Sequence, residues 1–229
     1  MKKRIVILTG AGVSADSGIN TFRDADGLWE GHDVTQVATP EAFQRNPELV
    51  LRFYNERRQQ LSEVEPNAGH LALVELEQKY DVQIITQNVD DLHERAGSSN
   101  ILHLHGELLK GRSSVDPKCI VELEEDIEMG DLAPDGSQLR PHIVWFGEAV
   151  PMMEIAAGIC LTADMCIIIG TSMVVYPAAG LVDFVPMSSP IYVVDPKVPD
   201  IYTSHTIEFI AERGAQGVPK LVEQLMKEA

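Results

Sequence analysis

Two histidines near the middle of the chain have the side chain best suited to proton transfer at neutral pH. His103 and His105 fall in the stretch 100–105, where alternating apolar residues predict a strand that places both rings on one face. Such a pair could ligate a metal, although no third ligand is apparent nearby. His105 could instead act alone as a general base, because a free imidazole has a pKa of about 6.5. His103 is then its structural neighbour.

Polar side chains end an earlier predicted strand, residues 82–86. Gln87, Asn88 and Asp90 follow it directly, and doubly wound sheets bind ligands at the carboxyl ends of their strands. Amides can hold ribose hydroxyls and water, and a carboxylate can accept from an amide NH₂. Capping of a turn is the alternative role for these residues.

A glycine-rich turn, Gly10-Ala-Gly12, follows the apolar residues 5–8, which predict a buried parallel strand. Ser14 and Ser17 are suited to cap a helix after the turn. A strand, a turn and a helix N-terminus together form a site for a phosphate. With Ala15 the turn also fits the loose dinucleotide-binding fingerprint, although it could be only a turn.

Tyr54 and Arg57 are three residues apart in a predicted helix and therefore share one of its faces. A guanidinium can bind a carboxylate with two parallel hydrogen bonds, and a tyrosine hydroxyl can donate a third. A surface tyrosine beside an arginine paired with Glu56 or Glu63 is the alternative.

Strands and helices alternate along the chain, which predicts a Rossmann-like, doubly wound parallel sheet with helices on both faces. The predicted strands are residues 5–8, 82–86, 100–105, 166–170 and 191–195, and the predicted helices are 40–62, 71–80, 91–96, 152–163, 178–185 and 218–227. Residues 107–139 interrupt the alternation with an acidic run from Glu122 to Glu128, so we expect a water-exposed insertion outside the sheet. Residues 25–29 predict a loop in which Trp29 either closes over a ligand or anchors the loop to the core.

The composition is that of a soluble globular protein. The 229 residues are 45% hydrophobic and 23% charged, and the formal net charge of −17 argues against nucleic-acid and anionic-membrane partners. No apolar run is long enough for a signal peptide or a membrane span. The three cysteines, Cys119, Cys160 and Cys166, form no Cys-x-x-Cys pair, so we expect a reduced, cytoplasmic protein.

Five motifs together identify a family that the chain resembles. They are Gly10-Ala-Gly-Val-Ser-Ala-Asp-Ser-Gly18 with Thr21-Phe22-Arg23-Asp24, Thr86-Gln-Asn-Val-Asp90, His105-Gly106, Val144-Trp-Phe-Gly-Glu148 and Gly170-Thr-Ser172. In these motifs and their order, from about residue 5 to residue 200, the chain resembles the sirtuins, the NAD-dependent protein-lysine deacylases.

The resemblance implies one catalytic domain over residues 1–229. Its Rossmann-like part would comprise about residues 1–20, 79–106 and 140–229, and insertions at about 21–78 and 107–139 would form a smaller module. The implied substrates are NAD and acylated lysine side chains of proteins. The acyl oxygen attacks the ribose C1′ as nicotinamide leaves, His105 deprotonates a ribose hydroxyl, and water releases lysine and O-acyl-ADP-ribose.

Site residues follow from the same resemblance, position by position. Catalysis is implied for His105 and Asn88, and substrate binding for Tyr54, Arg57, Val144, Trp145, Phe146, Gly147 and Glu148, the last five pairing with the peptide as an added strand. NAD binding is implied for Gly10, Ala11, Gly12, Ser14, Ser17, Phe22, Arg23, Trp29, Gln87, Asn88, Asp90, Gly170, Thr171, Ser172, Val193, Val194, Asp195, Gly214 and Ala215.

The chain departs from the commonest sirtuin pattern in its metal ligands. Most sirtuins carry two Cys-x-x-Cys pairs between the catalytic histidine and the Trp-Phe-Gly-Glu stretch, whereas this interval holds Ser113, Ser114 and a single thiol, Cys119. One thiolate cannot complete a tetrahedral zinc site, so we expect no zinc and a module held by packing or hydrogen bonds. Val193 also stands where an asparagine is frequent. Tyr54-x-x-Arg57, in contrast, matches the desuccinylase branch.

Other functions remain open on the residues alone. A dehydrogenase could use the glycine turn, but no acidic residue ends the next strand in the position that would hold a ribose. A non-catalytic NAD or ADP-ribose binding module would not require both Asn88 and His105. NAD hydrolysis and ADP-ribosyl transfer could use the same site.

Overall fold

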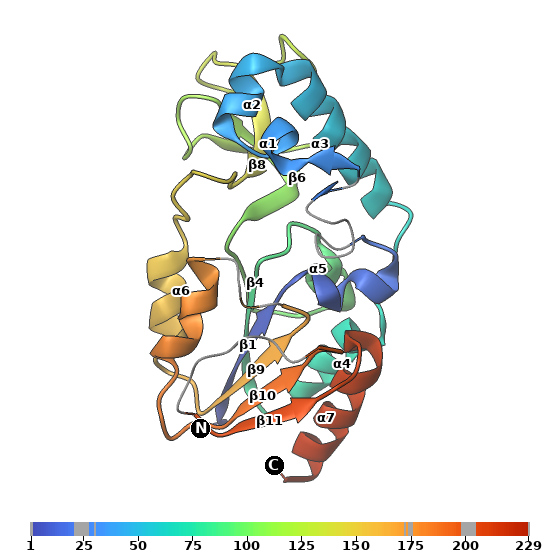
Figure 1. Cartoon of the computed structure of the whole chain (residues 1–229), viewed down its shortest axis with the longest axis vertical. Helices are drawn as coiled ribbons and strands as arrows, with labels where there is room; N and C mark the ends of the chain where they lie inside the picture. Colours follow the sequence, from blue (N-terminus) through green and yellow to red (C-terminus); the bar gives the residue numbers. More distant parts are fainter. Residues whose placement is uncertain are drawn as a thin grey trace.

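The computed structural model describes residues 2–20, 28–29, 31–171, 173, 176–197 and 205–228. Within these residues the chain forms two parts along its long axis (Figure 1). A six-stranded parallel sheet covered by helices lies at one end, and a smaller module of helices and antiparallel strands lies at the other. The expected class, a Rossmann-like α/β sheet with a smaller module, is confirmed.

Apolar strands form the parallel sheet in the order β11-β10-β9-β1-β4-β5. Their bounds are β1 Arg4–Thr9, β4 Asp81–Thr86, β5 Ile101–His103, β9 Met165–Ile169, β10 Ile191–Val194 and β11 Ile207–Ile210. In β1, Ile5 is in register with Val82 of β4 and with Met165 of β9. The chain places β4 and β5 on one side of β1 and β9 to β11 on the other. The carboxyl ends of β1, β4 and β9 therefore meet at the switch point where such sheets bind ligands.

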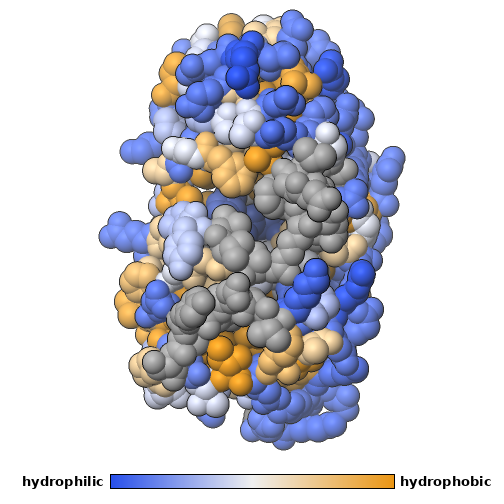
Figure 2. All heavy atoms as spheres, in the orientation of Figure 1, coloured by the Kyte–Doolittle hydropathy of each residue, from blue (hydrophilic) through white to orange (hydrophobic). Residues whose placement is uncertain are grey.

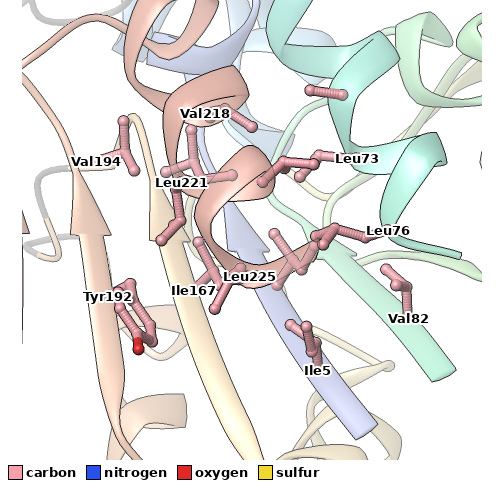
Figure 3. Close-up of a cluster of buried hydrophobic side chains, with 14 of the residues drawn as sticks. Ile5, Leu73, Leu76, Val82, Ile167, Tyr192, Val194, Val218, Leu221 and Leu225 are labelled. Atoms are coloured by element: carbon pink, nitrogen blue, oxygen red, sulfur yellow. The ribbon is translucent and has the colours of Figure 1, made fainter. Parts of the chain in front are cut away.

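Helices cover both faces of this sheet because its strands carry apolar side chains on both sides. On one face α4 (Ala68–Leu76) and α7 (Gly214–Glu228) pack together and bury Leu73, Leu221 and Leu225 against β1 and β9 (Figure 3). On the other face lie α6 (Met153–Cys160) and η4 (Ala178–Phe184), a 3₁₀ helix.

The small module has its own two apolar clusters. Its helices are α1 Val34–Val37, α2 Pro40–Arg45 and α3 Pro47–Leu61, and its strands are β2 Leu28–Trp29, β3 His32–Asp33, β6 Gly106–Ser113, β7 Ile120–Glu122 and β8 Leu139–Ile143. One cluster joins Phe53 and Tyr54 of α3 to Trp145. The other joins Leu51 to Ile127 and Leu139. The segment 107–139 lies outside the parallel sheet, as expected, but it contains strands and a small core.

Helix ends differ from the sequence prediction where capping decides them. The helix predicted over 40–62 is two helices, because the Asn46 side chain accepts from the Leu49 amide and caps α3, with Pro47 in its first turn. The helix predicted after the glycine turn is instead two short 3₁₀ helices, η1 (Ala11–Val13) and η2 (Ala15–Ser17), without side-chain caps. Neither Ser14 nor Ser17 is therefore a helix cap.

Two boundaries of the small module also differ from the expected ones. Helix α4, placed in the module from the sequence, packs against α7 and the parallel sheet. Strand β8, assigned to the Rossmann-like part, pairs antiparallel with β6 in the module. Strand β11 was not predicted, because only part of its short sequence is buried. Leu71, the first residue of the predicted helix 71–80, is 51% exposed.

Hydrogen bonds connect the strands of the module in the interval where most sirtuins carry cysteine pairs. The Ser113 hydroxyl lies 2.7 Å from that of Ser137 and accepts from the amides of Val115 and Asp116. Ser137 donates to a carboxylate oxygen of Asp135 at 2.7 Å, so the proton between the two hydroxyls comes from Ser113. These bonds connect the end of β6 to the turn before β8.

Candidate active site

A buried hydroxyl connects the first two polar motifs. Ser14, beside η1, accepts from the Asn88 amide at 3.1 Å and donates to the Asp90 carboxylate at 3.0 Å. The motifs meet because β1 and β4 are neighbours and end at the same edge of the sheet. Burial, the largest effect, raises the pKa of Asp90 to about 6. At neutral pH this site therefore holds a buried carboxylate that is only weakly favoured over its acid form.

His70 completes the bonding of Ser14, and the sequence analysis did not assign it. Its Nδ1 accepts from the Asn67 amide at 3.3 Å, so its Nε2 carries the proton and points at the Ser14 hydroxyl, 3.5 Å away. Burial lowers the pKa of His70 to about 4, so the ring is neutral. The only sequence signal was its place in Pro66-Asn-Ala-Gly-His70, the stretch that separates two predicted helices.

His105 has the hydrogen bonding of a general base. Its Nδ1 lies 3.0 Å from the Gln87 carbonyl oxygen, which can only accept, so Nδ1 carries the proton and Nε2 has the lone pair of the neutral ring. Burial lowers the pKa of His105 below its ordinary value, which keeps the ring neutral at pH 7. Gly106 follows with φ +85°, and a Cβ there would lie 1.9 Å from the His142 carbonyl oxygen. Glycine is therefore required for β6 to start beside the base.

The glycine turn approaches the end of β9. Gly10 and Gly12 donate from their amides to the carbonyls of Ile169 and Gly170, at 3.0 and 2.8 Å. A Cβ on Gly12 would lie 2.6 Å from Gly170 Cα, so these glycines let two backbone turns pack directly. The amide of the intervening Ala11 has no backbone partner among the described residues.

Further polar groups line the same edge. Gln87 donates to the Thr171 hydroxyl at 3.2 Å, and Ser17 accepts from Asn67 at 3.0 Å. Asp195, at the end of β10, is buried and accepts from the Lys197 amide at 2.9 Å.

The remaining NAD-binding assignments have three outcomes. Val193 and Val194 point into the two cores of the sheet, so their side chains cannot contact a ligand, and only their backbone remains available. The two α7 residues stay close to the turn: Gly214 approaches Val13, and the Ala215 amide donates to Asp16 at 3.3 Å. Phe22, Arg23 and Ser172 lie outside the described residues.

Arg57 presents unpartnered hydrogen-bond donors next to an aromatic cluster. Its guanidinium lies 4.7 Å from the Phe53 ring centre, and its side chain is 15% exposed. Nη2 is 3.5 Å from Glu56, but Nε and Nη1 are buried without a partner among the described residues. A buried N–H group without an acceptor is costly, so these donors can bind an acceptor group.

Tyr54, on the same face of α3, is fully buried rather than exposed. Its hydroxyl accepts from the Trp145 indole N–H at 3.0 Å, which leaves its own proton to donate. Trp29 packs edge-on against the Phe53 and Tyr54 rings, with centroids 5.1 and 5.9 Å away. Trp29 therefore packs on α3 of the module, which agrees with one of its two expected roles, anchoring to the core.

The segment Val144 to Glu148 runs from beside His105 into the module. The Val144 amide donates to the His105 carbonyl at 2.8 Å. Phe146 is 49% exposed, whereas Trp145 is buried. The Glu148 carboxylate accepts from Arg112 at 2.9 Å and Arg140 at 2.8 Å, and it also accepts from the Trp145 amide. Both carboxylate oxygens therefore hold this segment in place, and the expected pairing of the Glu148 backbone with a peptide stays a prediction.

The arrangement fits NAD by its donor set. Amide donors, hydroxyls and two buried carboxylates, Asp90 and Asp195, lie along the carboxyl edge of the sheet, and this mixture suits ribose hydroxyls, a carboxamide and phosphates. Figure 2 shows a hollow with hydrophilic surface between the module and the parallel-sheet part. In the part of the chain that the structure describes, no three His, Cys, Asp or Glu residues are grouped to hold a metal, and no helix is long and apolar enough to cross a membrane.

Comparisons with known proteins agree on one family. The Sir2 family model matches residues 10–177 of this chain. A Helicobacter pylori protein named NAD-dependent protein deacylase is 55% identical over 227 residues, which cover 99% of each chain. A crystal structure of a Sir2 homologue–NAD complex matches with a TM-score of 0.88 at 38% identity, covering 99% of this chain and 91% of the other. A structure of Sir2 bound to acetylated peptide matches with a TM-score of 0.78 at 29% identity, covering 99% and 93%.

Proposed function

The chain belongs to the Sir2 family, and on that premise we propose that it removes acyl groups from protein lysines with NAD as co-substrate. The observation that carries the proposal is the pairing of a neutral His105, with Nε2 available, and the buried Asn88–Ser14–Asp90 network one strand away. A module that only bound NAD would need the second feature but not the first.

His105 supplies the base. Its Nε2 accepts the proton of a ribose hydroxyl, and the bond from Nδ1 to the Gln87 carbonyl stabilises the resulting imidazolium. A positioned base of this kind contributes roughly 10²–10⁴-fold to turnover. NAD, when bound, supplies the ADP-ribosyl group that takes over the acyl group as nicotinamide is lost.

Asn88 and Asp90 hold the nicotinamide end. The Asp90 carboxylate can accept from a carboxamide NH₂, and it retains the Ser14 hydroxyl on its other side. The Asn88 amide is oriented by Ser14, so its oxygen stays available for a ribose hydroxyl or a water. Gly10 to Gly12, Thr171 and Asp195 continue the site toward the phosphates and the adenosine ribose.

The acyl group that fits best ends in a carboxylate. Two buried nitrogens of Arg57, Nε and Nη1, have no acceptor among the residues that the structure describes, and Tyr54 retains a hydroxyl proton. A succinyl or malonyl carboxylate can accept from Arg57 with two bonds, whereas an acetyl methyl group leaves the cation unpaired. Since Tyr54 is fully buried, Arg57 is the main contact. The segment from Val144 to Glu148, in which Phe146 is 49% exposed, would pair with the peptide.

The test is incubation with NAD and matched acetyl-, malonyl- and succinyl-lysine peptides. We expect nicotinamide release that depends on the acyl peptide, with O-acyl-ADP-ribose found by mass spectrometry. Equal nicotinamide release without peptide would instead identify an NAD hydrolase. Binding of NAD without its consumption would identify a binding module, and formation of reduced cofactor, followed by absorbance, would identify a dehydrogenase.

A further inference from the structure

His103 has a hydrogen-bonding environment unlike that of the other described site histidines. It ends β5, and its side chain is 9% exposed. Its Nδ1 lies 3.1 Å from the Asn88 carbonyl oxygen, and its Nε2 lies 2.7 Å from the Glu94 carboxylate on α5 (Leu92–Ala96). The ring therefore bridges the active-site segment after β4 and a neighbouring helix.

The two partners determine the protonation of this ring. A carbonyl oxygen only accepts, and an ionised carboxylate only accepts. The bond from His103 helps to keep the pKa of Glu94 below its ordinary value despite the opposing effect of burial. Both ring nitrogens must then donate, so His103 carries two protons and a positive charge. His105, with a single carbonyl partner, needs only one proton.

The charge surroundings favour this cation. Acidic groups lie near it on three segments, and the other charged or titratable neighbours are few. The acidic groups are Asp90 and Asp91 after β4, Glu94 on α5 and Glu107 on β6; the others are the neutral, buried His93 on α5 and Lys110 on β6. Burial is the largest single effect and opposes the charge, but the bond to Glu94, the charges of Glu94 and Glu107 and the bond to Asn88 together outweigh it, so the pKa of His103 lies above its ordinary value.

We propose that His103 is a positioning residue, held as an imidazolium between the Asn88 carbonyl and Glu94, that fixes the active-site segment 87–90 and favours ionised Asp90. One bond fixes the peptide group of Asn88, whose side chain binds Ser14 in the site. The positive charge acts on Asp90, whose burial otherwise favours the neutral acid. Loss of the proton would remove one of the two bonds and the charge together.

The inference rests on the proposed deacylase function only for its activity readout. As the pH rises through the pKa of His103, kcat/KM should fall, giving an alkaline limb set by this ring. Glu94→Gln is the sharpest variant, because the glutamine amide can donate to a neutral Nε2 and preserve the geometry while the charge is lost. Removing one adjacent opposite charge should move that limb by about one pH unit toward acid. At pH values above the limbs of both enzymes, kcat/KM of the variant should then be about tenfold lower than that of the wild type.

Glu65→Gln is the matched control. Glu65 pairs with Arg95 of the same helix α5 at 2.8 Å and is 82% exposed, but it does not contact His103. This variant removes the same charge nearby, and its pH profile should coincide with that of the wild type. At pH values on the acid side of the limb, where His103 is protonated in the wild type and in both variants, kcat/KM of the Glu94→Gln enzyme should also match that of the wild type.

Ring protonation is measured directly by ¹⁵N NMR of the histidine side chains, without any substrate. We expect both nitrogens of His103 to be protonated at pH 7, and His103→Gln assigns the signals. A ring with a single proton at pH 7 would overturn the inference whether or not the enzyme deacylates. An unchanged alkaline limb in Glu94→Gln would overturn it too. A doubly protonated His103 ring in a protein without deacylase activity would refute the proposed function but support the inference that His103 is an imidazolium.

Discussion

Replacing Arg57 by methionine tests how the acyl group is selected. Methionine fills a similar volume along the Phe53 ring but carries no N–H groups and no charge. Two donors of Arg57, Nε and Nη1, are buried without a partner in the described part of the chain, and the contact of Nη2 with Glu56 is long at 3.5 Å. The native arginine is therefore available to a carboxylate, and little else in the described structure is lost with it.

The magnitude follows from these free donors. A hydrogen bond to a charged group contributes about 1.5–3 kcal/mol, so the wild type should favour succinyl-lysine over acetyl-lysine by roughly 10- to 100-fold in kcat/KM. Arg57→Met should remove most of that preference. Deacetylation should stay equal or improve, because the variant no longer leaves a buried cation unpaired above a methyl group.

The assay compares kcat/KM for succinyl- and acetyl-lysine peptides of one sequence, with nicotinamide release as the signal. Arg52→Met is the control, since Arg52 lies on the same helix but is exposed. Tyr54→Phe should lower the preference less, and it should also lower Tm, because the buried Trp145 indole N–H loses its acceptor. If Arg57→Met slows both reactions by the same factor, Arg57 does not read the acyl group.

Three further predictions concern the base, the metal and acid stability. His105→Ala should lower turnover by roughly 10²–10⁴-fold with Tm nearly unchanged; steady-state kinetics and a thermal melt check this, and near-wild-type turnover would contradict the assignment. Dialysed protein should hold no stoichiometric zinc, because the interval has the single thiol Cys119; metal analysis and melts with and without chelator would reveal a bound ion. Burial lowers the pKa of His70 to about 4 and of His93 to about 3, below about 6.5 in the unfolded chain. The unfolded state therefore binds protons first, and the free energy of unfolding should fall by several kcal/mol between about pH 6.5 and 4, partly offset by Asp90, whose raised pKa acts oppositely. Urea titrations at a series of pH values measure this, and a flat profile would contradict it.

Local sequence was enough for the framework of the sheet. Strands β1, β9 and β10 were predicted because each is an apolar run buried on both faces, and β4 because of its apolar Val82, Ile84 and Ile85; neighbouring residues alone reveal these patterns. The polar residues from Gln87 to Asp90 were recognised because they directly follow the predicted strand 82–86. The order of the motifs was enough to indicate the family.

Tertiary structure decided what each polar group can do. His103 and His105 are two residues apart in the sequence and have the same side chain. Among the described residues, however, the His103 ring has two accepting partners and the His105 ring has one. Those partners are Gln87 and Asn88, which follow β4, and Glu94 on α5, and the alternation of residues 100–105 says nothing about them. Protonation depends on burial and on such partners, so it cannot be read from spacing.

The same reason explains the other differences. Nothing local indicated that Ser14 would join Asn88 and Asp90 instead of capping a helix, or that Glu148 would hold two arginines. Arg57 could have been a surface ion pair by its sequence alone. Only the packing of α3 buries Nε and Nη1 without an acceptor among the described residues, because burial and hydrogen-bond satisfaction depend on residues that are distant in the chain.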